Sequence, residues 1–108
     1  MKNGKLFDFS ACPKGGEIFD TIVEGAGDFK LERTVSRGAE SPDGFWYDQD
    51  RDELVAVISG SAVLEFEKEK ISLGAGDWIV IKKGSRHRVA ATSENPPCVW
   101  LTAFGNFK

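Results

Sequence analysis

Histidine and cysteine are scarce in this sequence. Its 108 residues include one histidine, His87, and two cysteines, Cys12 and Cys98. Two cysteines do not make the disulfide framework that stabilises many small secreted domains. Cys98 lies in an apolar segment, so we expect a small core residue there. We expect Cys12 to be exposed near the N-terminal tail.

A strong charge of one sign and long apolar runs are also missing. Fourteen basic and 17 acidic residues give a net charge of −3, so we expect no nucleic-acid partner. The one basic stretch, residues 82–88, is expected to be a solvated loop rather than a phosphate site. No segment approaches the ~20 apolar residues of a spanning helix, and the N-terminal residues do not resemble a signal peptide. We therefore expect a cytoplasmic protein without a membrane partner.

No segment shows a sustained helical period, and short strands take the place of helices. Twelve glycines and four prolines supply turn signals between apolar or alternating stretches. The expected strands are residues 19–23, 29–37, 53–59, 62–66, 71–73, 77–81, 86–92 and 98–104. This pattern predicts a single all-β domain, a sandwich or barrel, over residues 19–108. Residues 1–18 are expected to form an irregular N-terminal segment.

The segment from Leu54 to Ile58 is apolar at every position. Such a strand is typical of one that is buried on both faces, so it needs apolar cover outside the domain. A second copy of the chain would supply that cover, which predicts a homodimer. The alternative is that the N-terminal segment covers this face.

Two spaced motifs indicate a family. Glu53 is followed by six residues and Gly60, while Gly76 is followed by five residues, Lys82, Gly84 and, two residues later, His87. Together they resemble the paired motifs of small single-domain cupins. The resemblance implies an antiparallel β-barrel of the jelly-roll type with its site inside, around Glu53 and His87. It also implies a divalent metal (iron, manganese, nickel or zinc) and a small-molecule substrate for a dioxygenase, isomerase or decarboxylase.

The sequence departs from this family pattern at the metal ligands. Tyr47, Asp48 and Gln49 stand where cupins carry two histidines. Gln49 lies four residues before Glu53, so in an extended chain both side chains point the same way. An amide oxygen, a carboxylate and the His87 imidazole would form an oxygen-rich metal site. Gln49, Glu53 and His87 are therefore the candidate metal ligands.

Three further residues are candidate contacts for the substrate. Arg33 lies among apolar residues on one face of its strand and could pair with Glu53 or with a substrate carboxylate. Trp46 and Tyr47 are the other two candidates. No catalytic residue is assigned from sequence. Two alternatives to the metal enzyme stay open: a small-ligand binding protein without metal, and a metal-free enzyme with His87 as base and Tyr47 as acid.

Overall fold

The computed structural model describes all residues, 1–108, and contains strands and turns but no helix. The strands are β1 (Glu17–Glu24), β2 (Lys30–Ser36), β3 (Asp52–Ser59), β4 (Ser61–Phe66), β5 (Lys70–Gly74), β6 (Trp78–Ile81), β7 (His87–Thr92) and β8 (Cys98–Gly105). Each corresponds to one expected strand, so the all-β prediction is confirmed. There is accordingly no helix long and apolar enough to cross a membrane.

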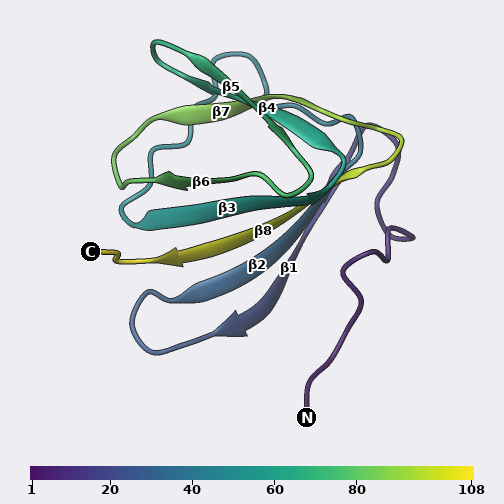
Figure 1. Cartoon of the computed structure of the whole chain (residues 1–108), viewed down its shortest axis with the longest axis horizontal. Coiled ribbons are helices and arrows are strands. Elements are labelled where there is room, and N and C mark those ends of the chain that lie inside the picture. Colours follow the sequence, from purple (N-terminus) through teal and green to yellow (C-terminus); the bar gives the residue numbers. More distant parts are fainter.

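The strands form two antiparallel sheets that face each other (Figure 1). The larger sheet has the order β1-β2-β8-β3-β6, and the smaller has the order β5-β4-β7. Hydrogen bonds do not close the two sheets into one continuous barrel. The chain first passes from the larger sheet to the smaller one at Gly60, between β3 and β4. Gly60 has a φ of 74°, a left-handed conformation that glycine adopts without steric cost.

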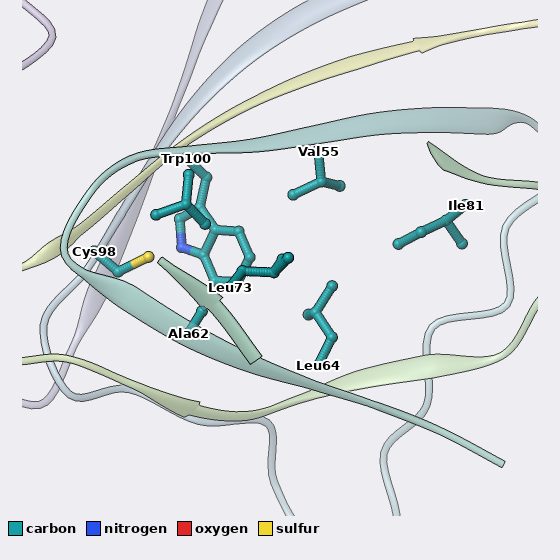
Figure 2. Close-up of a cluster of buried hydrophobic side chains, with 8 residues drawn as sticks. Val55, Ala62, Leu64, Leu73, Ile81, Cys98 and Trp100 are labelled. Carbon is teal, nitrogen blue, oxygen red and sulfur yellow. The ribbon is translucent and has the colours of Figure 1, made fainter. Parts of the chain in front are cut away.

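The main core lies between β3, β6 and β8 of the larger sheet and β4 and β5 of the smaller one. Figure 2 shows its side chains pointing toward one another from the two sheets. The cluster contains Val55, Val57, Ala62, Leu64, Leu73, Ile81, Cys98 and Trp100. Cys98 is fully buried, and burial raises the pKa of its thiol to about 12. Residues of β1 and β2 do not belong to this cluster, so the inner face of these two strands is not part of the main core.

A second apolar cluster lies on the outer face of the larger sheet. Cys12 packs there with Val35 and Val99, and Phe9 and Ile58 are among the residues that border it. Cys12 is only 3% exposed, so the expectation of an exposed thiol was wrong. The N-terminal segment folds back over β2 and β8 and covers this part of the sheet. The apolar face of β2 therefore points outward, and its polar face points into the space between the sheets.

Candidate functional site

A cavity of about 340 Å³ opens between the two sheets on the inner face of β1, β2 and β8. Aromatic and aliphatic side chains form part of its wall. Its polar lining combines carboxylates, hydroxyls and cations from several strands. These polar residues are Glu17, Lys30, Glu32, Thr34, Ser36, Tyr47, Gln49, Arg51, Glu53, His87 and Thr102.

A buried acid–imidazole pair joins the two sheets inside this cavity. Glu53 on β3 and His87 on β7 lie with Oε1 and Nε2 2.9 Å apart. The exposed fractions of their side chains are 7% and 6%. Gln49 donates from Nε2 to the other carboxylate oxygen, Oε2, over 3.2 Å. The structure thus brings together the three residues that the sequence proposed for the centre of the site.

The surroundings of His87 favour its charged form. Its Nδ1 lies 3.0 Å from the carbonyl oxygen of Ser85, which can only accept, so Nδ1 carries a proton. Its Nε2 faces the Glu53 carboxylate. Burial lowers the pKa of His87, but the hydrogen bonds to Glu53 and Ser85 and the charge of Glu53 outweigh it and raise the pKa above 6.5. Both ring nitrogens of His87 are therefore engaged, Nδ1 by the Ser85 carbonyl oxygen and Nε2 by Glu53.

Tyr47 is held against His87 by backbone and ring contacts. The two residues exchange backbone hydrogen bonds of 2.7 and 3.1 Å, and their rings stack at 5.4 Å between centroids. Burial and the charges of Glu17, Glu53 and Glu32 raise the pKa of the Tyr47 phenol above 10. At neutral pH its hydroxyl therefore keeps its proton. No group of the protein hydrogen-bonds this hydroxyl, so it can donate to a ligand.

A protein-family comparison supports the resemblance that the motifs indicated. The description that matches the chain is "Cupin domain", and the match runs over residues 31–104, more than half of the chain. The chain belongs to the cupin family. No match was found among curated protein sequences.

Solved structures similar to this cupin span a wide range of sequence identity. A protein of Ralstonia eutropha JMP134, provisionally named a mannose-6-phosphate isomerase, is 41% identical over 99% of this chain and 100% of that chain, with a TM-score of 0.87. A cupin-2 domain containing protein of Shewanella frigidimarina NCIMB 400 is 25% identical over 83% and 80% of the two chains, with a TM-score of 0.65. A cupin superfamily protein of Desulfitobacterium hafniense DCB-2 is 14% identical over 89% and 83%, with a TM-score of 0.74. The last likeness shows the fold alone.

Arg33 and Trp46 do not lie where the sequence placed them in this cupin. Arg33 is on the outer face of β2, where its guanidinium donates to the carbonyl oxygens of residues 5, 6 and 8 and pairs with Asp20. The expectation that Arg33 pairs with Glu53 was wrong, because its side chain points to the outer face of β2 and Glu53 points into the cavity. Trp46 precedes the inward-facing Tyr47 and therefore points outward, where the Arg86 guanidinium lies 5.3 Å from its ring centroid.

Several cavity residues of this cupin were missed in the sequence. Glu32, Thr34 and Ser36 line the cavity from β2, and Glu17 lines it from β1. For the three residues of β2 the signal was their alternation with Leu31, Arg33 and Val35, which gives the strand a polar face. A polar face is typical of a solvated sheet surface, and only its position opposite a gap between the sheets makes it a cavity wall.

The family implies a divalent metal, and the residues of this site fit one poorly. No group of three or more His, Cys, Asp or Glu side chains is arranged to hold a metal ion. The two strongest donors, Glu53 Oε1 and His87 Nε2, hydrogen-bond each other at 2.9 Å, while Gln49 presents an N–H group to Glu53. Catalytic metal sites ordinarily take three protein ligands, commonly imidazoles or thiolates with a carboxylate. One imidazole and one carboxylate fall short of that set.

Proposed function

We propose that this cupin binds a small polyhydroxylated molecule of the sugar class in its cavity and exchanges a proton with it through Glu53. The observation that carries the proposal is the buried Glu53–His87 pair, which faces a cavity of about 340 Å³. Small-molecule sites span about 300–1,000 Å³, so this volume suits a ligand of monosaccharide size.

The lining of the cavity supports a ligand with many hydroxyl groups. A sugar hydroxyl both donates and accepts hydrogen bonds, so its site needs acceptors and donors side by side. Glu17 and Glu32 supply acceptors, and the hydroxyls of Thr34 and Thr102 can do either. The ring of Phe104 adds an apolar surface for the carbon-bound hydrogens of a sugar ring.

The geometry gives the residues of the pair different roles. The Glu53 carboxylate is the proton acceptor, and the Tyr47 hydroxyl donates a hydrogen bond to a ligand oxygen. Both ring nitrogens of His87 are engaged, Nδ1 by Ser85 and Nε2 by Glu53, so His87 is a positioning residue that orients the Glu53 carboxyl group. This differs from the expectation of His87 as the base, because neither ring nitrogen is free to take a proton.

Aldose–ketose isomerisation is the reaction class that these roles suit. The carbon-bound proton passes from C2 to Glu53 and returns to C1, while a hydroxyl proton moves between O2 and O1, so that the atoms of aldose and ketose balance. The Tyr47 hydroxyl stabilises the charge that develops on the carbonyl oxygen between these steps. The similar protein of Ralstonia eutropha, provisionally named a mannose-6-phosphate isomerase, supports the same class.

A non-catalytic binding protein is the second candidate. Both oxygens of Glu53 already accept hydrogen bonds, Oε1 from His87 and Oε2 from Gln49. A carboxylate engaged on both oxygens is well suited to anchoring a hydroxyl group and less well suited to removing a proton from carbon. In this case a ligand binds without turnover.

An isotope-exchange experiment tests the proposal. In D₂O without added metal, we expect the protein to convert D-mannose 6-phosphate to the ketose and to place deuterium on the product carbon, as followed by proton NMR. Glu53→Gln keeps the shape of the side chain and removes the base, so the rate should fall by about 10²–10⁴-fold. Glu40→Gln, at an exposed position outside the cavity, is the matched control and should keep full activity.

The outcomes separate the candidates. Binding that Glu53→Gln weakens, without deuterium exchange, supports the binding protein and overturns the enzyme. Neither binding nor exchange by the wild-type protein for D-mannose 6-phosphate, D-mannose or D-mannuronate overturns the sugar-class proposal.

A further inference from the structure

Two cations lie over one aromatic ring in the cavity wall. The guanidinium carbon of Arg51 is 4.4 Å from the centroid of the Phe104 ring, and the ammonium of Lys30 is 5.6 Å from it. Phe104 on β8 is the register partner of Lys30 on one side and of Glu53 on the other. The three side chains thus follow one another across the inner face of the sheet. A ligand lying along Phe104 would meet a cation at one end and the Glu53 carboxylate at the other.

Arg51 has no anionic partner within the protein. Its one hydrogen bond runs from Nη1 to the backbone carbonyl oxygen of Asp28 over 3.1 Å, and it forms no ion pair. A guanidinium carries five N–H donors in a planar fork, which leaves most of them free toward the cavity. Lys30 pairs with Glu32 at 2.9 Å and has further donors on its ammonium. Most donors of Arg51 therefore have no acceptor in the protein, and the ammonium of Lys30 lies over the same ring.

The carboxylates of the cavity determine where an anionic group of a ligand can bind. Glu17, Glu32 and Glu53 all line it, so an anionic group placed deep in the cavity would meet like charges. Of the three basic residues in the lining, His87 is paired with Glu53 and Lys30 with Glu32, and Arg51 is the one without an anionic partner. An anionic group is stabilised only beside Arg51 and Lys30.

We propose that Arg51 and Lys30 bind an anionic group of the ligand, so that the substrate class is a sugar phosphate or a sugar acid. This inference rests on the proposed sugar-class function and deepens it. The planar fork of Arg51 matches two oxygens of a phosphate or carboxylate, and Lys30 adds a second charge. The uncharged, hydroxylated part of the ligand then lies along Phe104 toward Glu53.

The test compares three sugars of the same ring. D-mannose is neutral, D-mannose 6-phosphate carries a phosphate, and D-mannuronate carries a carboxylate. By isothermal titration calorimetry we expect at least one of the two anions to bind about tenfold or more tightly than D-mannose. The tighter of the two identifies the group that the site takes. Raising the salt concentration should weaken the binding of the anion and leave the affinity for D-mannose unchanged.

Neutral variants locate the effect. Arg51→Gln should abolish the advantage of the anions over D-mannose, and Lys30→Gln should reduce the same advantage. Arg86→Gln is the matched control, because Arg86 is a partly exposed arginine over Trp46, outside the cavity. It should behave as the wild type. The hydrogen bond of Arg51 is on the exposed side of the protein, so its variant should fold, as checked by thermal unfolding.

Failure of this inference is distinct from failure of the proposed function. If D-mannose binds, Glu53→Gln weakens it, and neither anion binds more tightly, only the anionic subsite is overturned. If the anions bind more tightly but Arg51→Gln and Lys30→Gln both retain the advantage, the subsite is likewise overturned. If none of the three sugars binds, the sugar-class function falls together with its subsite.

Discussion

The chemistry of this cupin depends on a pair of residues that satisfy each other. Glu53 and His87 are both buried, so each would be a costly isolated charge without the other. Removing one partner of a buried ion pair typically costs about 3–5 kcal/mol, because the other charge is left without compensation. The same contact occupies the atoms that a metal would need, since Oε1 and Nε2 face each other at 2.9 Å. The contact between Glu53 and His87 therefore affects stability, proton transfer and metal binding at the same time.

The pH dependence of stability tests the charge state of His87. Folding raises its pKa above 6.5, so the folded protein holds that proton more tightly than the unfolded chain does. The stability that it contributes is present below about pH 6.5 and is lost as the pH rises through the folded pKa. We expect the free energy of unfolding in urea to fall as the pH is raised above about 6.5. His87→Gln should show a flatter profile, and an equal slope in both proteins would rule out the ion pair.

The metal content of the purified protein tests the fit of the donor set. The family resemblance predicts a divalent metal, whereas the donor set of this site predicts that little is bound. Because only Glu53 and His87 are strong donors and they bind each other, we expect far less than one equivalent of iron, manganese, nickel or zinc by elemental analysis. Protein loaded with each metal and then dialysed should lose it. A stoichiometric metal that Glu53→Gln no longer retains would contradict this expectation.

At the scale of elements, the turn at Gly60 makes the first passage of the chain from the larger sheet to the smaller one. Gly60 has a φ of 74°, and a Cβ there would lie 2.4 Å from the Pro97 carbonyl oxygen and 2.5 Å from the Ser93 hydroxyl. We expect Gly60→Ala to lower the free energy of unfolding by about 2–4 kcal/mol, from backbone strain and the clash together. The measurement is urea unfolding followed by tryptophan fluorescence.

Gly44 provides a matched control for that substitution. Its φ of 78° is nearly the same, but a Cβ there would meet nothing within 4 Å. Gly44→Ala should therefore cost only the backbone term, about 1–2 kcal/mol. Equal losses in the two variants would show that the contacts with Pro97 and Ser93 contribute nothing.

At the scale of the whole molecule, an apolar surface remains on the outer face of the larger sheet. Trp78 is 67% exposed on the edge strand β6, although its type favours a core or cavity wall. A row of apolar register partners crosses this face from β6 through β3 and β8 to β2; its members are Val80, Leu54, Ala103 and Leu31. The N-terminal segment covers Ile58 but leaves Leu54 at the surface. It is therefore only part of the cover that the apolar segment of β3 needs.

The homodimer that the sequence predicts stays a prediction, and this surface is where we expect it. An edge strand beside an apolar face can pack against the same strand of a second copy. The two copies are then related by a two-fold axis, and each contact between them occurs twice. We expect light scattering coupled to size exclusion to give the mass of two chains. Trp78→Glu should shift the protein to one chain, whereas Phe7→Glu, an exposed aromatic on the N-terminal segment, should not. A wild-type protein with the mass of one chain at all concentrations would contradict the dimer.

The sequence by itself determined the strands, their turns and the centre of the site. Alternation and turn residues are local signals, so all eight strands could be located from them. The spacing of Glu53 and His87 in the family motifs was enough to place them together.

Only the tertiary structure decided which face of β2 points into the cavity. Its polar face lines the cavity, and its apolar face, with Arg33 and Val35, lies under the N-terminal segment. An alternating strand has two faces that differ in polarity, and polarity alone does not say what lies opposite each. That depends on contacts between residues far apart in the chain. The same long-range contacts turned Glu53 toward His87 and away from Arg33, and so set the chemistry that the cavity can support.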